Sequence, residues 1–129
     1  MVKGRVLVVD DQKAQADAMV DILRFEGHEA DAAYSVDEAL EKVGPDTHVV
    51  ATDLHIGDGC GYDLTRRLRE KDFGPQVCVV SATQSSGWEL KAREHGAYAT
   101  LAKPIRVNDF LPIVAQGIAL KRAQETRYS

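Results

Sequence analysis

Long apolar runs and secretion signals are missing from this sequence. No stretch approaches the ~18 consecutive apolar residues of a membrane-spanning helix, and the N-terminus shows no cleavage-site pattern, so we expect no signal peptide. The two cysteines, Cys60 and Cys78, form neither a CxxC pair nor a disulfide framework, and we expect reduced thiols. These absences together predict a cytoplasmic protein without a membrane partner.

A basic excess is also missing. The chain has 16 Lys and Arg residues against 20 Asp and Glu residues, which gives a net charge of −4. Binding to a nucleic-acid backbone needs a basic face, so this charge argues against nucleic acid as a direct partner. The 129 residues contain no internal repeat and no low-complexity segment, and they fit one domain with a sizeable core.

Apolar runs alternate with segments of helical period along the whole chain. Strands are expected at 6–9, 29–33, 48–53, 77–82 and 97–102, and helices at 14–25, 36–43, 62–70, 88–95 and 108–123. Strict alternation with short connections predicts the α/β class, with a doubly wound, five-stranded parallel sheet covered by five helices.

Local signals refine the ends of these elements. In the first helix, Ala18, Ile22 and Phe25 have i, i+4, i+7 spacing, which predicts the buried face, and Gly27 ends the helix. The segment 57–61, "GDGCG", is expected to be a flexible loop.

Side chains near other element ends carry further predictions. Ser35, with Glu38 three residues later, has the pattern of a capping box, and Asn108 is expected to cap the last helix. His28 and His48 flank strands and are interpreted as structural residues.

Polar side chains lie where four of the strands end: Asp10 and Asp11, then Asp53, Ser81 and Lys103. The carboxyl ends of parallel strands meet at one edge of a sheet, so we expect these side chains to converge. Three carboxylates in one crevice repel each other, and a hard cation such as Mg²⁺ relieves the repulsion. A nucleotide site is disfavoured, because the turn "DDQKAQ" has no glycine and carries two negative charges.

This set of residues resembles the receiver domain of two-component response regulators, over about residues 5–120. The motifs of that family are an acidic pair, a lone Asp, Ser/Thr-Ala and Lys-Pro, each after a strand. Here they are matched by Asp10-Asp11, Asp53, Ser81-Ala82 and Lys103-Pro104. The resemblance implies a flavodoxin-like sheet of strand order 2-1-3-4-5, with a receiver domain at 1–122 and a tail or the start of a linker at 123–129.

The resemblance also implies roles at the acidic edge. Asp53 would be the phosphoacceptor, which takes a phosphoryl group from a sensor histidine kinase or a phosphotransfer protein. Mg²⁺ would be the cofactor, held directly by Asp11, Asp53 and the backbone carbonyl of His55, and through a water molecule by Asp10.

Phosphoryl binding and switching would involve Lys103, Ser81 and Ala82, with a cis peptide bond before Pro104. The family places a switch aromatic three residues before the lysine, and this chain has Thr100 there.

Further departures surround these motifs. Tyr98, two positions before Thr100, is either a substitute aromatic or an ordinary tyrosine of an edge strand. Gly57 replaces the proline usual in the family. His55 and Thr83 flank the acceptor, and we hypothesise that they tune dephosphorylation.

The output of such a domain would be a surface for a downstream effector or a fused output domain. That face would comprise helix 88–95, with Trp88, Lys91 and His95, strand 97–102 and the last helix. The chain would have no substrate besides itself. The alternatives are a docking module that works without phosphate, which Thr100 favours, and a Mg²⁺-dependent phosphatase, which would need a second Asp at position 55.

Overall fold

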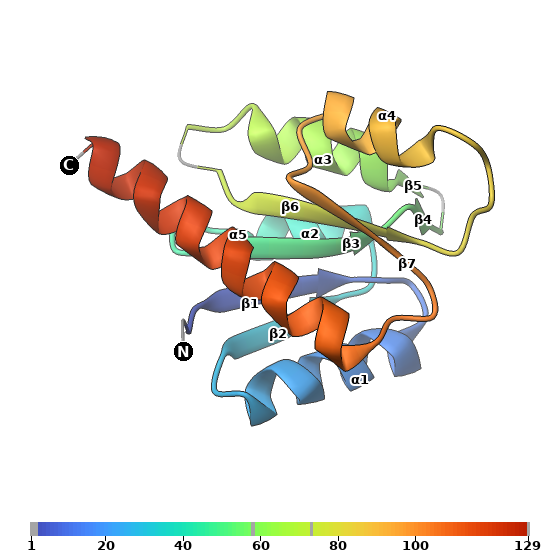
Figure 1. Ribbon diagram of the computed structural model, residues 1–129, viewed down its shortest axis with the longest axis horizontal. Coiled ribbons are helices and arrows are strands. Elements are labelled where there is room, and N and C mark those ends of the chain that lie inside the picture. Colours follow the sequence, from blue (N-terminus) through green and yellow to red (C-terminus); the bar gives the residue numbers. More distant parts are fainter. Residues whose placement is uncertain (1–2, 58, 73, 129) are drawn as a thin grey trace.

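A five-stranded parallel sheet forms the centre of the computed structural model, which describes residues 3–57, 59–72 and 74–128. The order across the sheet is β2 (Glu29–Ala33), β1 (Arg5–Val9), β3 (Val49–Asp53), β6 (Gln76–Ser81) and β7 (Ala99–Ala102). All four neighbouring pairs are parallel. Without the small hairpin β4–β5, this is the predicted order 2-1-3-4-5, so the predicted fold class is confirmed (Figure 1).

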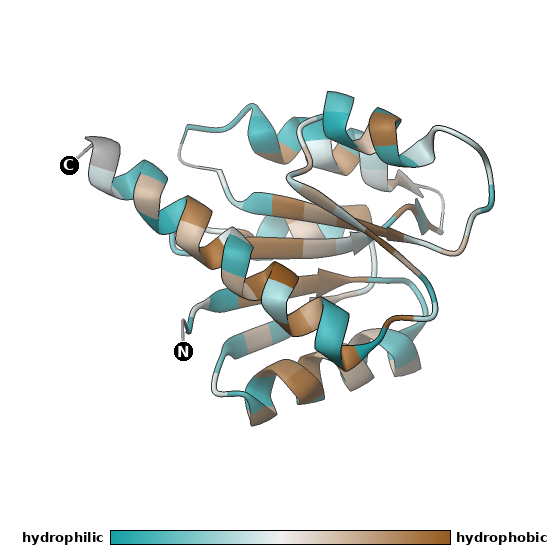
Figure 2. Cartoon of the chain, in the orientation of Figure 1, coloured by the Kyte–Doolittle hydropathy of each residue, from teal (hydrophilic) through white to brown (hydrophobic). Residues whose placement is uncertain are grey.

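Five helices cover the two faces of the sheet (Figure 1). They are α1 (Lys13–Phe25), α2 (Val36–Lys42), α3 (Gly61–Arg69), α4 (Trp88–Glu94) and α5 (Val107–Tyr128). Helices α1 and α5 pack on one face, and the other three pack on the opposite face. Figure 2 shows the apolar strands enclosed between these layers. None of the described helices has the length and apolar character needed to cross a membrane.

The buried face of α1 differs from the prediction. Its buried residues are Ala16, Val20 and Leu23. Phe25 is 90% exposed, and Ala18 is exposed as well, so the predicted face points away from the sheet. Both stripes have the same i, i+4, i+7 spacing, and the docking of the helix on β1 and β2 selects the stripe that is buried.

The ends of the helices confirm two capping signals and correct a third. Gly27 (φ 95°) follows the C-cap of α1, and Ser35 Oγ accepts the Glu38 N–H at 3.1 Å. Asn108 does not cap α5, because the helix already begins at Val107. The Arg106 carbonyl accepts the first intrahelical bonds there, so Asn108 lies within the first turn.

The segment after β3 is more regular than the flexible loop that we expected. His55–Ile56 (β4) pairs with Gly59–Cys60 (β5) in a short antiparallel hairpin, and residue 58 lies outside the described residues. Burial of the Ile56 side chain, which is 1% exposed, anchors this hairpin. Gly57 makes the turn with a left-handed backbone (φ 52°), which glycine adopts without steric cost.

His28 and His48 bind the first residue of β1 and the residue before it, as their structural interpretation predicts. Gly4 donates its N–H to Nδ1 of His28 at 3.1 Å, and Arg5 donates its N–H to Nδ1 of His48 at 2.9 Å. Both rings are therefore held in a form with an unprotonated Nδ1.

Candidate functional site

Three carboxylates gather at the carboxyl ends of β1 and β3. Asp10 and Asp11 follow β1, and Asp53 is the last residue of β3, which pairs directly with β1. Each residue offers a carboxylate oxygen within 4.8 Å of the other two. Asp10 is buried, Asp53 half-buried and Asp11 exposed, so the cluster extends from the core to the surface. The folding of adjacent strands thus brings Asp53 close to an acidic pair that lies at least 42 positions earlier in the sequence (53 − 11).

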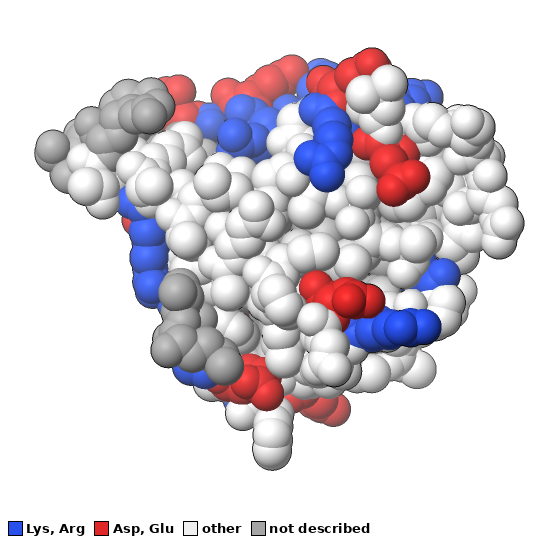
Figure 3. Space-filling model, in the orientation of Figure 1, with Lys and Arg blue, Asp and Glu red and all other residues white. Residues whose placement is uncertain are grey.

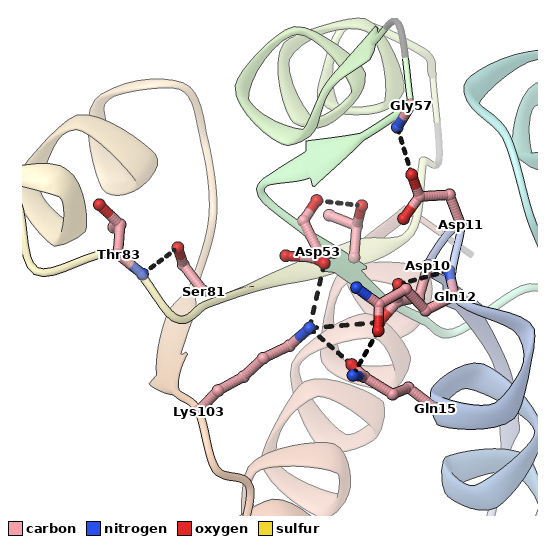
Figure 4. Close-up of polar contacts among 10 residues, drawn as sticks. Asp10, Asp11, Gln12, Gln15, Asp53, Gly57, Ser81, Thr83 and Lys103 are labelled. Atoms are coloured by element: carbon pink, nitrogen blue, oxygen red, sulfur yellow. Dashed lines mark hydrogen bonds and ion pairs between the residues drawn. The ribbon is translucent and has the colours of Figure 1, made fainter.

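Lys103, which follows β7, supplies the positive charge of the cluster (Figure 4). Its Nζ lies 3.0 Å from Asp53 Oδ2 and 3.3 Å from Asp10 Oδ2, and it donates to Gln15 Oε1 at 2.9 Å. Partial burial lowers the pKa of Lys103, but the hydrogen bond and charge of Asp53, with those of Asp10, outweigh burial and raise the pKa overall. Lys103 is therefore a cation at neutral pH.

Backbone amides orient the two acids of the pair. Gln12, at the N-cap of α1, donates its N–H to Asp10 Oδ1 at 3.0 Å. Gly57, in the turn of the hairpin, donates its N–H to Asp11 Oδ2 at 2.7 Å. Each carboxylate keeps further lone pairs for a cation or for Lys103. The hairpin is thereby connected to the acidic pair (Figure 4).

Ser81 closes the opposite side of the site. It ends β6 and is fully buried, and its Oγ accepts the Thr83 N–H at 3.0 Å. Its carbonyl accepts the Lys103 N–H at 2.9 Å, which connects the two predicted phosphoryl-binding residues. The next residue, Ala82, is exposed.

An open pocket of about 430 Å³ lies above these residues. It is lined by Asp11, Gln12, Asp53, His55, Gly57, Ala82, Thr83 and Lys103. His55 opens β4 with an exposed side chain, and Thr83 lies two residues after Ser81. Most of the predicted site residues therefore border one solvent-accessible space.

The donor set fits a hard divalent cation. Carboxylate oxygens are the ligands that Mg²⁺ and Ca²⁺ prefer, and the acidic cluster contributes three of them from two neighbouring strands. No cysteine or histidine belongs to this cluster among the described residues, which disfavours softer metals. The Lys103–Pro104 peptide bond is cis, as the resemblance implied.

Thr100 and Tyr98, the two residues considered for the place of the switch aromatic, have different surroundings. Thr100 is half-buried and pairs with Val79, which belongs to the core beneath α3 and α4. Tyr98 precedes β7, and its hydroxyl donates to the Ile113 carbonyl of α5 at 2.6 Å. Tyr98 therefore lies on the α5 side of the sheet, whereas Val79, the neighbour of Thr100, belongs to the cluster on the opposite side.

Sequence reasoning missed two polar arrangements. Gln15, in the first turn of α1, contacts Lys103, and its place one turn after the acidic pair could have indicated this. Tyr62 of α3 lies beneath α4: its hydroxyl donates to the Trp88 carbonyl at 3.0 Å, and His95 stacks on its ring at 5.2 Å. Lys91 Nζ lies 4.9 Å from the centre of that ring. Trp88 itself is buried in the core.

Comparisons with known proteins agree with this geometry. The family model described as response regulator receiver domain matches residues 6–115. The transcriptional regulatory protein TrcR of Mycobacterium tuberculosis is 30% identical over 83% of this chain and 42% of its own length. CutR of Streptomyces coelicolor, also a transcriptional regulatory protein, is 32% identical over 83% of this chain and 50% of its own. The chain thus spans at most half the length of these two relatives.

Solved structures of other response regulators have the same fold as this chain. A CheY-like receiver domain protein from Methanospirillum hungatei superposes with a TM-score of 0.85 at 25% identity, over 95% of this chain and 99% of its own. A response regulator from Burkholderia pseudomallei is described with a phosphorylated aspartic acid, a calcium ion and citrate. It superposes with a TM-score of 0.80 at 26% identity, over 98% of this chain and 75% of its own. The chain belongs to the response regulator receiver domain family.

Proposed function

We propose that this chain is a phosphorylation-controlled receiver in which Asp53 accepts a phosphoryl group from a histidine of a sensor histidine kinase or phosphotransfer protein. The observation that supports this most strongly is the Lys103 ammonium, 3.0 Å from Asp53 Oδ2, within a cluster of three carboxylates. The phosphorylated aspartic acid described for the Burkholderia pseudomallei relative is consistent with it.

The transfer needs positioning more than covalent chemistry from the protein. A carboxylate oxygen of Asp53 attacks phosphorus, an O–P bond forms, and the P–N bond of the donor breaks with its electron pair going to the imidazole nitrogen. Lys103 attracts the phosphoryl oxygens as a point charge. In this structure Ser81 Oγ accepts the Thr83 N–H. That bond does not use the hydroxyl proton of Ser81, which would be donated to the phosphoryl group beside Ala82.

Mg²⁺ is the cofactor that we assign to the acidic cluster. Asp11, Asp53 and the backbone carbonyl of His55 would bind it directly, and Asp10 would act through water. The bound ion would supply positive charge that offsets the charge of the phosphoryl group. The three carboxylates fit this ion because they are hard oxygen donors.

We assign to phosphorylation a change in the conformation of the face formed by α4, β7 and α5. This face would bind a downstream effector or an output domain fused beyond the tail at 123–129, in the cytoplasm. The domain would catalyse only its own phosphorylation and dephosphorylation. Because Thr100 replaces the switch aromatic and Tyr98 is bound to α5, the switch would depend on Ser81 more than in relatives with that aromatic.

Thr100 also supports a second candidate, a docking module that works without phosphate. Incubation with acetyl phosphate and Mg²⁺, followed by intact-mass measurement, separates the two functions. The switch predicts a mass gain of one phosphoryl group that Asp53→Asn abolishes and that Asp21→Asn, an exposed carboxylate of α1, leaves intact. A wild-type protein that stays unmodified would favour the docking module, and turnover of a generic phosphoester would favour a phosphatase.

A further inference from the structure

Gln15 connects α1 to the charged centre of the site. Its side-chain carbonyl accepts a hydrogen bond from Lys103 Nζ at 2.9 Å, which is the shortest of the three contacts of that ammonium. An ammonium group has three donors and no acceptor. Asp53, Asp10 and Gln15 therefore occupy all three donors of Lys103.

A second glutamine fixes the direction of the Gln15 amide. Gln15 Nε2 donates to Gln12 Oε1 at 2.6 Å, so the amide nitrogen faces Gln12 and the oxygen faces Lys103. Gln12 in turn donates its N–H to Asp10. The contact between Gln15 and Lys103 thus belongs to a chain of hydrogen bonds around the acidic pair (Figure 4).

Gln15 has no role in the core that would explain this arrangement. It is exposed, and it lies at the polar end of an apolar groove of about 490 Å³ between α1 and α5. Uncharged residues form most of the surface that Figure 3 shows around the middle of α5. An exposed glutamine that orients a half-buried ammonium acts on the position of that ammonium, with little effect on the stability of the fold.

We propose that Gln15 is a positioning residue for phosphoryl transfer, which rests on the function proposed above. The two carboxylates alone draw Lys103 toward the acidic cluster, and Gln15 holds the ammonium from the side of α1. The amide is neutral, so it competes with an incoming phosphoryl anion less than a carboxylate does. Lys103 can then exchange its contact with Asp53 for the phosphoryl oxygens while Gln15 keeps it in place.

The substitution Gln15→Met tests this proposal, because methionine has similar length and lacks a strong acceptor. We expect an unchanged melting temperature and a rate of labelling by acetyl phosphate about threefold to tenfold lower, less than the ~100-fold that a misplacement of ~1 Å can cost. NMR relaxation of the Lys103 side chain should show greater mobility in this variant, with Lys42 unchanged as an internal reference. Ala14→Met, which adds the same side chain at a neighbouring exposed position, should match the wild type in both measurements.

The conservative variant Gln15→Glu separates positioning from other effects. It keeps an oxygen at the same distance, so Lys103 should remain ordered, although the added negative charge slows labelling. Unchanged Lys103 mobility in Gln15→Met would overturn the proposal, whether or not labelling slows. Labelling of Gln15→Met at the wild-type rate would overturn it as well. If the wild type itself is not labelled, the proposed function fails, and the relaxation measurement still decides whether Gln15 holds Lys103.

Discussion

The backbone of Gly61 lies directly against the carbonyl group of Asp53. A Cβ atom at Gly61 would be 2.5 Å from the Asp53 oxygen and 2.9 Å from Leu54 Cα, both of them backbone atoms. Gly61 also donates its N–H to the Leu54 carbonyl at 2.7 Å. The start of α3 and the end of β3 therefore approach each other as closely as only glycine permits.

Replacing Gly61 by alanine should damage both stability and the site. Neither backbone contact can move without shifting Asp53, so we expect a loss of about 1–3 kcal/mol in the free energy of unfolding from overpacking. Labelling of Asp53 should slow as well. Gly44→Ala is the matched control, because its Cβ would meet only a side-chain atom, the carboxylate oxygen of Asp46 at 3.1 Å. Equal urea midpoints for the two variants would contradict the prediction.

Restoring the proline that is usual in the family at position 57 should also be harmful here. Gly57 has a φ of 52°, whereas proline requires about −65°, and proline would remove the N–H that binds Asp11 at 2.7 Å. We expect Gly57→Pro to cost more than about 1 kcal/mol. Gly57→Asn, which keeps the N–H and tolerates the left-handed region, should cost less. Denaturation with urea measures both variants, and a proline variant as stable as the asparagine variant would exclude this geometry.

Acid should destabilise the protein through His28 and His48. Burial, with nearby positive charge as a second cause, lowers the pKa of both rings below the usual 6.5. The unfolded chain then binds more protons below about pH 6.5, so the histidine contribution to stability is present above that pH and is lost as the pH falls through the folded pKa values. Protonation of Nδ1 would also break the hydrogen bonds from Gly4 and Arg5.

Unfolding free energies measured from about pH 7 to about pH 5 test this effect. The double variant His28→Gln and His48→Gln keeps an acceptor that does not titrate, and its stability should fall less steeply with acid. Parallel curves for the double variant and the wild type would assign the acid sensitivity to the carboxylates instead.

The sequence predicted the sheet and the position of the site because both depend on local patterns. Apolar runs and helical periods define the alternation, and a polar residue at the end of a parallel strand must lie at the common edge. The buried stripe of α1 was not predictable, because Ala16 and Ala18 begin stripes of identical spacing. The hairpin at 55–60 depends on tertiary packing, which no local pattern encodes. The contact of Gln15 with Lys103 had only a weak signal, the place of Gln15 one turn after the acidic pair.

The corrected face of α1 makes a stability prediction. Leu23 is fully buried, so Leu23→Ala should lower the free energy of unfolding by about 2–5 kcal/mol. Phe25 is 90% exposed, so Phe25→Ala should change it by no more than about 0.5 kcal/mol. Urea denaturation compares the two variants. A larger loss of unfolding free energy for Phe25→Ala than for Leu23→Ala would contradict this prediction. It would support the buried face expected from the spacing of Ala18, Ile22 and Phe25.

The lifetime of the phosphorylated state should depend on His55 and Thr83. Both side chains border the open pocket that contains Asp53, and a hydrolytic water would reach the phosphoryl group through this pocket. The imidazole and the threonine side chain narrow this path, so replacing both by alanine should shorten the lifetime several-fold. The decay of the phosphorylated mass after removal of acetyl phosphate measures it, with Ser86→Ala, an exposed residue farther along the same loop, as the control. A double variant that decays at the wild-type rate would show that neither side chain limits the access of water.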